Sequence, residues 1–272
     1  KHFATAREQL SAVEPLVERL EARDDALERY RDARRDALDR REAVAARVDR
    51  LADLVAYEGV DWDASVEDLR APIEAYNEAA AAAYDDARRS SSARAFLDWV
   101  GTVARDYPLV GFTAPPDDVT AFLDDTAVGA EPVPTLLEYA GYSRSKLDHY
   151  VADPGRFLAV VGGSETYLRT LSADPLTVAW PPAPAEELRF RCGELIAAVG
   201  RLDDAAAAEC REVRALTRRD DYDRLREAAA AADALDDDER ERVASGAASD
   251  SLAEARATLS SIDDALAEYP ER

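Results

Sequence analysis

Apolar residues recur with alternating spacings of three and four between residues 10 and 55, which is the period of one helix face. Charged residues, namely Asp24, Arg31, Arg34 and Arg41, occupy four positions of this stripe. The pattern predicts one helix over residues 3–57, about 80 Å long, and a rod of this length needs partner helices to cover its apolar face. The stripe consists of Leu10, Val13, Val17, Leu20, Leu27, Leu38, Val48 and Val55.

Further helical periods follow a break at Glu58–Asp61. Ser65, with Asp68 three residues later, is typical of a helix start, and an apolar stripe then predicts a second helix over residues 65–106. Pro184, followed by two glutamates, predicts the start of a third long helix over residues 184–235. Two shorter helices are expected over residues 237–245 and 250–269. The short connection at residue 58 favours an antiparallel arrangement of the first two helices.

Residues 107–183 differ in kind, because prolines and glycines repeatedly interrupt short apolar segments. We expect a small domain of short helices here, with Leu176–Trp180 as a lone strand. The predicted fold is therefore all-α. An elongated antiparallel helical bundle or coiled coil is formed by residues 1–106 and 184–272, and a small helical domain, residues 107–183, is inserted between its second and third helices.

Charge is the strongest compositional signal. The chain holds two lysines, Lys1 and Lys146, against 32 arginines, and its 57 acidic residues give a net charge of −23. A surface rich in carboxylates and poor in lysine stays hydrated in concentrated salt. The composition resembles that of haloarchaeal proteins, which implies an uncharacterised coiled-coil protein of a halophilic archaeon. Within residues 21–50, nine arginines balance nine acids. Pairs such as Asp25 with Arg29 and Asp36 with Arg40 predict a self-paired helix surface.

The two cysteines, Cys192 and Cys210, lie on one apolar stripe of the predicted third helix. Eighteen residues of helix would separate them by about 27 Å, too far for a disulfide. We therefore interpret both as small buried hydrophobic residues in a reducing cytoplasm. The sequence contains no apolar run of about 20 residues, so no membrane span is predicted.

The common catalytic templates are absent from the sequence. Neither lysine follows a glycine, as a phosphate-binding loop requires, and no Gly-x-Gly occurs. The two histidines and two distant cysteines do not form a zinc motif. Asp61-x-Asp63-x-Ser65 begins like a calcium loop, but Val66 replaces its glycine and Pro72 its last ligand. We therefore expect a protein that is not an enzyme, with no catalytic residues, no cofactor and no metal.

One sequence motif is more specific than those above. Glu138-Tyr139-Ala140-Gly141 is followed by Ser143, Leu147 and Val151, and residues 136–152 thereby resemble the helix-turn-helix of lactose-repressor-type regulators. Gly141 would allow the turn, Ser143 would cap the second helix, and Leu147 and Val151 would pack it onto the first. Leu137 departs from the small alanine of that family. The resemblance implies a nucleic-acid or partner contact through Ser143, Arg144, Ser145, Lys146 and His149, with Arg144 and Ser145 at base edges.

Aromatic residues crowd the same segment. Tyr139, Tyr142, Tyr150 and Phe157 form either the core of the small domain or an exposed patch that binds a partner. The sequence favours a non-enzymatic scaffold or adaptor that recognises a protein through residues 107–183. The alternative is a DNA-associated accessory factor that uses residues 136–152. A second copy of the chain could also cover the imperfect stripe of the first helix, as a homodimer.

Overall fold

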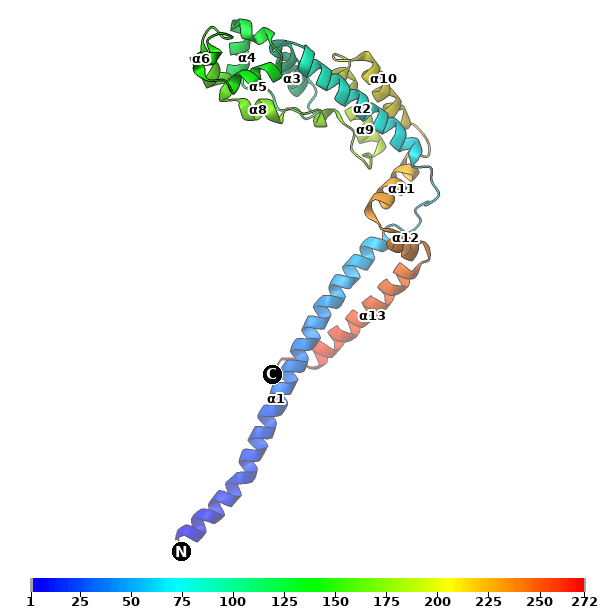
Figure 1. Ribbon diagram of the computed structural model, residues 1–272. Helices are drawn as coiled ribbons and strands as arrows, with labels where there is room; N and C mark the ends of the chain where they lie inside the picture. Colours follow the sequence, from blue (N-terminus) through cyan, green and yellow to red (C-terminus); the bar gives the residue numbers. More distant parts are fainter. Residues whose placement is uncertain (1, 272) are drawn as a thin grey trace. The chain divides into compact units, whose positions relative to one another are not determined.

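The computed structural model describes the backbone of residues 2–271 and the side chains of residues 13–271. Over this range the chain forms thirteen α-helices and no β-strand, so the predicted all-α class is confirmed (Figure 1). The contacts divide the chain into two compact units. Unit 1 comprises residues 1–60 and 234–272, and unit 2 comprises residues 61–233.

Unit 1 is built on the long first helix that the apolar stripe predicts. Helix α1 (His2–Val55) packs against α13 (Ala247–Glu268), and α12 (Asp237–Ala244) joins them near the end of α1. Figure 1 shows α13 lying along the second half of α1. The predicted last two helices, 237–245 and 250–269, agree with α12 and α13. The partner of α1 within its unit is therefore the C-terminal helix.

The arginines that interrupt the apolar stripe of α1 hold the end of α13. Arg34 Nη1 donates to the carbonyl oxygens of Leu266 (3.0 Å) and Tyr269 (2.5 Å), and Arg41 pairs with Asp263 at 2.5 Å. The last carbonyl groups of a helix lack intrahelical donors and carry partial negative charge, so a guanidinium is a favourable partner for them. Pairs of Asp25 with Arg29 and of Asp36 with Arg40 do not form in the described part of α1, although the sequence predicts them.

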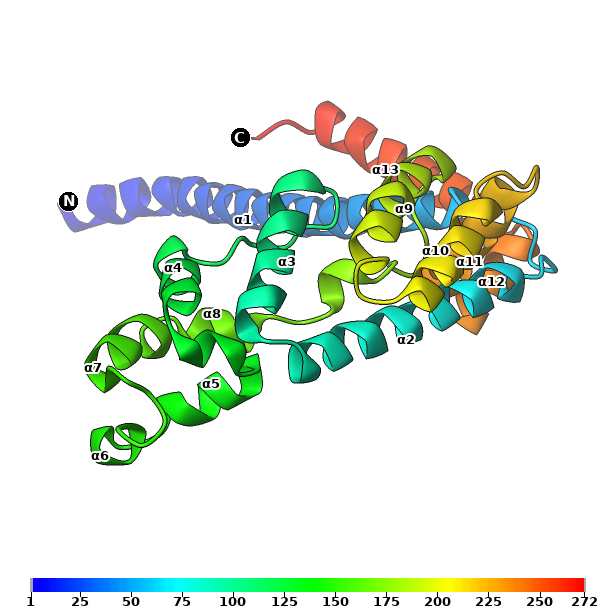
Figure 2. The ribbon, with the colours of Figure 1, turned by 90° about the horizontal axis from the view of Figure 1, so that it is seen from above.

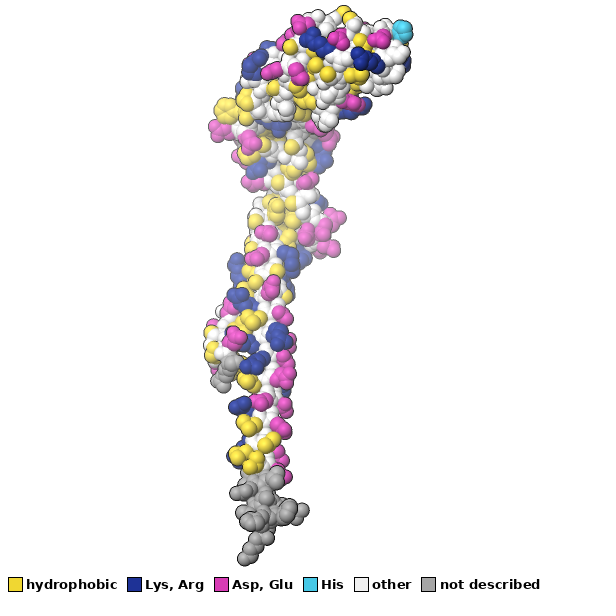
Figure 3. Space-filling model, turned by 90° about the vertical axis from the view of Figure 1, so that its left-hand side faces the viewer, with side chains coloured by type: hydrophobic (Ala, Val, Ile, Leu, Met, Phe, Trp, Pro, Cys, Tyr) yellow, Lys and Arg dark blue, Asp and Glu magenta, His cyan; other side chains and the backbone are white. Residues whose placement is uncertain are grey.

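The N-terminal part of α1 extends past the end of α13. Tyr30 donates its hydroxyl proton to the carbonyl oxygen of Pro270 (2.6 Å), which marks where α13 ends along α1. Every side chain from residue 13 to residue 26 is exposed. Figure 3 shows hydrophobic side chains gathered on one face of this segment. We call these the α1 stripe: Val13, Leu16, Val17 and Leu20, each about half exposed.

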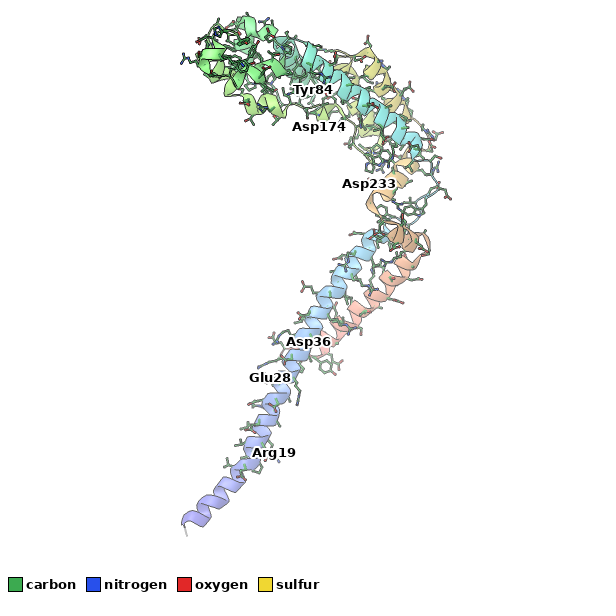
Figure 4. All side chains as sticks on the ribbon, viewed as in Figure 1. Arg19, Glu28, Asp36, Tyr84, Asp174 and Asp233 are labelled. Carbon is green, nitrogen blue, oxygen red and sulfur yellow. The ribbon has the colours of Figure 1, made fainter. Side chains whose placement is uncertain are left out.

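Unit 2 contains the larger core. The predicted second helix is two helices, α2 (Glu67–Ser90) and α3 (Ala93–Asp106), because the chain turns at Ser91–Ser92 and Ser92 caps α3. Helix α2 starts without a side-chain cap, so Ser65 does not play the predicted role. Four buried aromatic rings join these helices, with centroids 5.4–6.2 Å apart. They belong to Tyr84 (labelled in Figure 4), Phe96, Trp99 and Phe112.

The predicted third long helix is wrong. Residues 184–235 form three helices, α9 (Ala185–Val199), α10 (Asp204–Leu216) and α11 (Tyr222–Ala234). The break follows from Gly200 and from Asp203, whose carboxylate accepts from the amide of Ala205 (2.7 Å) and caps α10. Helices α9 and α10 lie side by side, and α10 also packs on α2 (Figure 2). Cys192 and Cys210 are therefore close together instead of being one long helix apart: the Cys210 thiol lies 3.9 Å from the Cys192 carbonyl oxygen.

Residues 107–183 consist of short helices, as predicted. The bounds are α4 (Asp117–Asp125), η1 (Ala127–Ala130), α5 (Val133–Ala140), α6 (Arg144–Leu147), α7 (Pro154–Phe157), η2 (Leu158–Gly162), α8 (Glu165–Thr170) and η3 (Asp174–Leu176). Their core includes Phe122 and Phe157, whose ring centroids are 6.2 Å apart. The segment does not stand alone as the expected inserted domain, however. Residues 61–106 and 184–233 belong to the same compact unit.

The predicted strand at Leu176–Trp180 does not form: Leu176 ends η3, and the residues after it have no partner strand in the described structure. The side chain of Asn77 replaces that partner: its Nδ2 donates to the Val178 carbonyl (2.9 Å), and its Oδ1 accepts from the Val178 amide (2.8 Å). Tyr76 donates to the Leu176 carbonyl (2.7 Å). Buried main-chain groups need hydrogen-bond partners. Here α2 supplies them through side chains, so the β-like sequence forms no sheet.

Candidate partner-binding surface

The segment that resembles a helix-turn-helix is folded partly as predicted. Helix α5 ends at Ala140, and the amide of Lys146 donates to Ser143 Oγ (3.4 Å), so Ser143 caps α6 as expected. Leu147 and Val151 are buried, which also agrees with the prediction. Gly141 differs: its φ of −81° is open to any residue, so the turn does not depend on glycine.

The second helix of the motif is much shorter than the resemblance implies. Helix α6 spans four residues, Arg144–Leu147, and the chain turns through residues 148–150 before Val151. Arg144, Ser145, Lys146 and His149 are all exposed. One helical turn therefore presents these side chains. A recognition helix in the major groove contacts bases along several residues of its N-terminal half, and α6 offers little more than its first turn.

Three tyrosines lie together beside this turn. The ring centroids of Tyr139 and Tyr150 are 5.0 Å apart, and Tyr142 is 5.6 Å from each. Tyr150 is half exposed and the other two are half-buried, whereas Phe157 is fully buried in the core. The sequence allows these aromatic residues to be either core or exposed patch. The three tyrosines form the exposed patch, and Phe157 belongs to the core. We call Tyr139, Tyr142 and Tyr150 the tyrosine patch.

Local charges fix the orientation of the patch. Lys146 Nζ lies 3.1 Å from the ring centroid of Tyr142, a cation–π contact. The Tyr142 hydroxyl donates to the Glu138 carboxylate, and this hydrogen bond raises the pKa of Tyr142 above its usual value. The ring thus stays a neutral phenol held between a cation and an anion. This arrangement presents aromatic surface with a defined geometry.

The patch is less acidic than the rest of the chain. Residues 142–169 carry four basic and three acidic side chains, a net charge of +1. Within the described structure, neither Arg144 nor Lys146 forms an ion pair with a carboxylate. No carboxylate therefore neutralises either cation, although Lys146 contacts the Tyr142 ring. The candidate residues chosen from the sequence included the cations but not the tyrosines. The sequence shows the crowding of these tyrosines, but it leaves open whether they form the core or an exposed patch.

The described residues present no group of three or more His, Cys, Asp or Glu side chains arranged to hold a metal ion. Hydrogen bonds from Arg219 lower the pKa of the Asp221 carboxyl group. A lowered pKa in an exposed ion pair does not suit an acid that must hold a proton near neutral pH. In the part of the chain that the structure describes, no helix has both the length and the apolar character needed to cross a membrane.

A family model described as a domain of unknown function, DUF7118, matches residues 1–266. No curated protein and no solved structure matches the chain significantly. The family match covers both compact units, including the α1 stripe and the tyrosine patch. The chain therefore belongs to the DUF7118 family.

Proposed function

We propose that this protein is a non-enzymatic helical scaffold or adaptor that binds a protein partner through the tyrosine patch. The observation that carries the proposal is the position of Tyr139, Tyr142 and Tyr150. Three rings in mutual contact lie at the surface, beside two cations without ion pairs. Tyrosine and arginine dominate the energetically important positions of protein interfaces. Tyrosine also offers a large contact area at a low cost in side-chain entropy.

The cations favour a partner with an acidic surface. Arg144 and Lys146 flank the patch, and complementary charge raises association rates and excludes wrongly charged partners. The composition supports a cytoplasm of concentrated salt, as in a halophilic archaeon, as the place where this binding occurs. In such salt the screening length falls to about 3 Å, so aromatic contact area supplies more of the affinity than long-range charge does.

The α1 stripe supports the scaffold part of the proposal. Val13, Leu16, Val17 and Leu20 lie on a helical segment that α13 does not cover. Apolar residues at this spacing pair helices in coiled coils. We propose that this end of α1 binds a second copy of the chain, as a homodimer. Each protomer would then present its own tyrosine patch.

DNA binding is the second candidate function. It is favoured by the capped turn, since Ser143 fixes α6 and leaves Arg144, Ser145, Lys146 and His149 exposed. It is weakened by the length of α6, because a single turn reaches few base edges. The protein partner is therefore the preferred proposal, and DNA is an outcome that the same experiment detects.

Site-specific photocrosslinking in living cells tests the proposal. A photoreactive phenylalanine analogue replaces Tyr150 in one strain and Leu109 in a control strain. Both side chains are 50% exposed within residues 107–183. We expect one discrete crosslinked protein from position 150, and its loss when Lys146→Glu and Arg144→Glu are added. Crosslinks to DNA from position 150 would support the second candidate instead. Equal crosslinks from both positions, or none from position 150, would contradict both.

A further inference from the structure

A pocket in unit 1 gathers arginines that have no partner. Its volume is about 470 Å³, and it is formed where the end of α1 meets the start of α12. Arg47 and Arg50 enter it from α1, and Arg242 enters it from α12. None of the three guanidinium groups forms a hydrogen bond or ion pair with a described residue. We call this the arginine pocket; it shares no residue with the tyrosine patch.

These three arginines lie where the end of α1 and α12 line the pocket, and all three are exposed. By contrast, Arg34 and Arg41, which precede Arg47 on α1, are engaged by carbonyl groups at the end of α13 and by Asp263. The chain holds 57 acids against 34 basic residues, so carboxylates are abundant. Three arginines that converge on a cavity without meeting one are therefore available as donors. Each guanidinium carries five N–H groups in a fixed planar fork.

The acids that line the pocket do not neutralise it. Glu239 accepts from the amide of Asp236 (3.2 Å) as part of the capping box of α12, so its carboxylate is held at the helix start. Asp53 is the other acid in the lining. Three arginines against two acids leave a net charge of +1. The pocket therefore favours an anion, and Asp53 can accept a hydrogen bond from a hydroxyl or amino group of the ligand.

The rest of the lining is apolar and aromatic. Leu51, Leu54 and Leu235 are buried, with exposed fractions of 3–9%, and form one wall with Tyr57 beside them. A bare inorganic anion would leave this wall without a contact. Pockets that bind small molecules typically enclose about 300–1,000 Å³ and combine apolar walls with a few convergent polar groups.

We propose that the arginine pocket binds a nucleoside monophosphate. The phosphate is held by Arg47, Arg50 and Arg242, since guanidinium forks match phosphate oxygens in bidentate geometry. The base packs mainly against Tyr57, because Leu51 and Leu54 are largely covered by the protein itself. Asp53 accepts from a ribose hydroxyl or an exocyclic amino group. The sequence alone did not indicate this site, because Arg242 lies almost 200 residues from Arg50 and residues 21–50 read as self-paired.

Isothermal titration calorimetry on the full chain with adenosine 5′-monophosphate tests the proposal, with adenosine and inorganic phosphate as matched part-ligands. We expect saturable binding of the monophosphate and binding at least about tenfold weaker for each part-ligand, because charge-assisted hydrogen bonds and base packing contribute separately. Arg47→Gln, Arg50→Gln and Arg242→Gln should each weaken binding about tenfold. Arg40→Gln is the control, since Arg40 is also an exposed arginine of α1 and lies outside the pocket.

Amide chemical-shift changes check the location of the site. The proposal requires them to cluster at residues 47–57 and 235–242 and to vanish in the three pocket variants, while circular dichroism shows that the variants remain folded. Loss of affinity in Arg40→Gln to the same degree would reduce the effect to general surface charge and would overturn the proposal. Equal affinity for inorganic phosphate, or no binding of the monophosphate, would overturn it too.

Discussion

The Cys210 thiol lies 3.9 Å from the carbonyl oxygen of Cys192, although 17 residues separate the two in sequence. This contact exists because α9 and α10 fold back on each other at Gly200–Asp203. Both cysteines are fully buried and free. Contact with the Cys192 thiol, together with burial, raises the pKa of Cys210 well above its usual value.

The first prediction concerns the reactivity of these thiols. Thiolate, rather than thiol, reacts with disulfide reagents, and buried thiols are not reached. We expect neither cysteine to react with Ellman's reagent in the folded protein and both to react in denaturant. A Ser145→Cys variant supplies the positive control, because Ser145 is exposed. Reaction of a native cysteine as fast as that of the introduced one would contradict the packing of α9 on α10.

The second prediction concerns alkaline pH. Burial raises the pKa of Tyr222 to about 12, and that of Tyr76 further. The folded state therefore keeps these protons at a pH where the unfolded chain, with tyrosine pKa values near 10, has lost them. Stability should be constant below about pH 10 and fall as pH rises through about 12, by up to about 1.4 kcal/mol per pH unit for each such group.

Urea unfolding across this pH range measures the effect. Tyr222→Phe removes one titrating group and also the hydrogen bond that Tyr222 donates to the Ala183 carbonyl (2.7 Å). The variant should be less stable than the parent near neutral pH and should lose stability less steeply above about pH 10. A parallel pH dependence for parent and variant would show that Tyr222 ionises normally in the folded state.

The third prediction concerns the α1 stripe. If Leu16 and Leu20 pair α1 with a second copy of the chain, sedimentation velocity should show concentration-dependent association. Leu16→Gln combined with Leu20→Gln should abolish this association without changing unimolecular unfolding, because both side chains are exposed in the single chain. Leu38→Gln, at another exposed leucine of α1, serves as control. Identical sedimentation of parent and double variant would remove the homodimer from the proposal.

The fourth prediction concerns salt. A net charge of −23 gives strong self-repulsion in the folded state at low ionic strength. Raising potassium chloride from about 0.1 M to about 1 M shortens the screening length from about 10 Å to about 3 Å. The thermal midpoint should therefore rise over this range. A midpoint that falls or stays constant would mean that the exposed ion pairs, which salt weakens, matter more than net repulsion.

Local features of the fold could be read from the sequence. The spacing of the apolar residues between 10 and 55 predicts that α1 is a helix and how long it is. Ser143 caps α6 because a short hydroxyl side chain before a helix can accept a hydrogen bond from its first amides. Small helices in residues 107–183 follow from the spacing of prolines and glycines. In the candidate site, the exposure of Arg144, Ser145, Lys146 and His149 fits their polar character.

The pairing of elements could not be read from the sequence in this way. The apolar stripe of residues 188–213 runs in phase through Gly200, so it fits one long helix as well as the hairpin of α9 and α10. The choice depends on α2, whose face both helices cover. Similarly, the tyrosine patch requires Tyr150 to turn back onto Tyr139, which depends on α6 ending after one turn. Amphipathic periodicity identifies a buried face but not the helix that buries it.

Asp61, the first residue of unit 2, forms an ion pair at 2.5 Å with Arg224, nine residues before the end of the unit. The first residue of the unit is thus in contact with the first turn of α11. Because α1 and α13 pack on each other within unit 1, their contact does not depend on residues 61–233. Length changes within residues 61–233 therefore need not alter the register of α1 against α13.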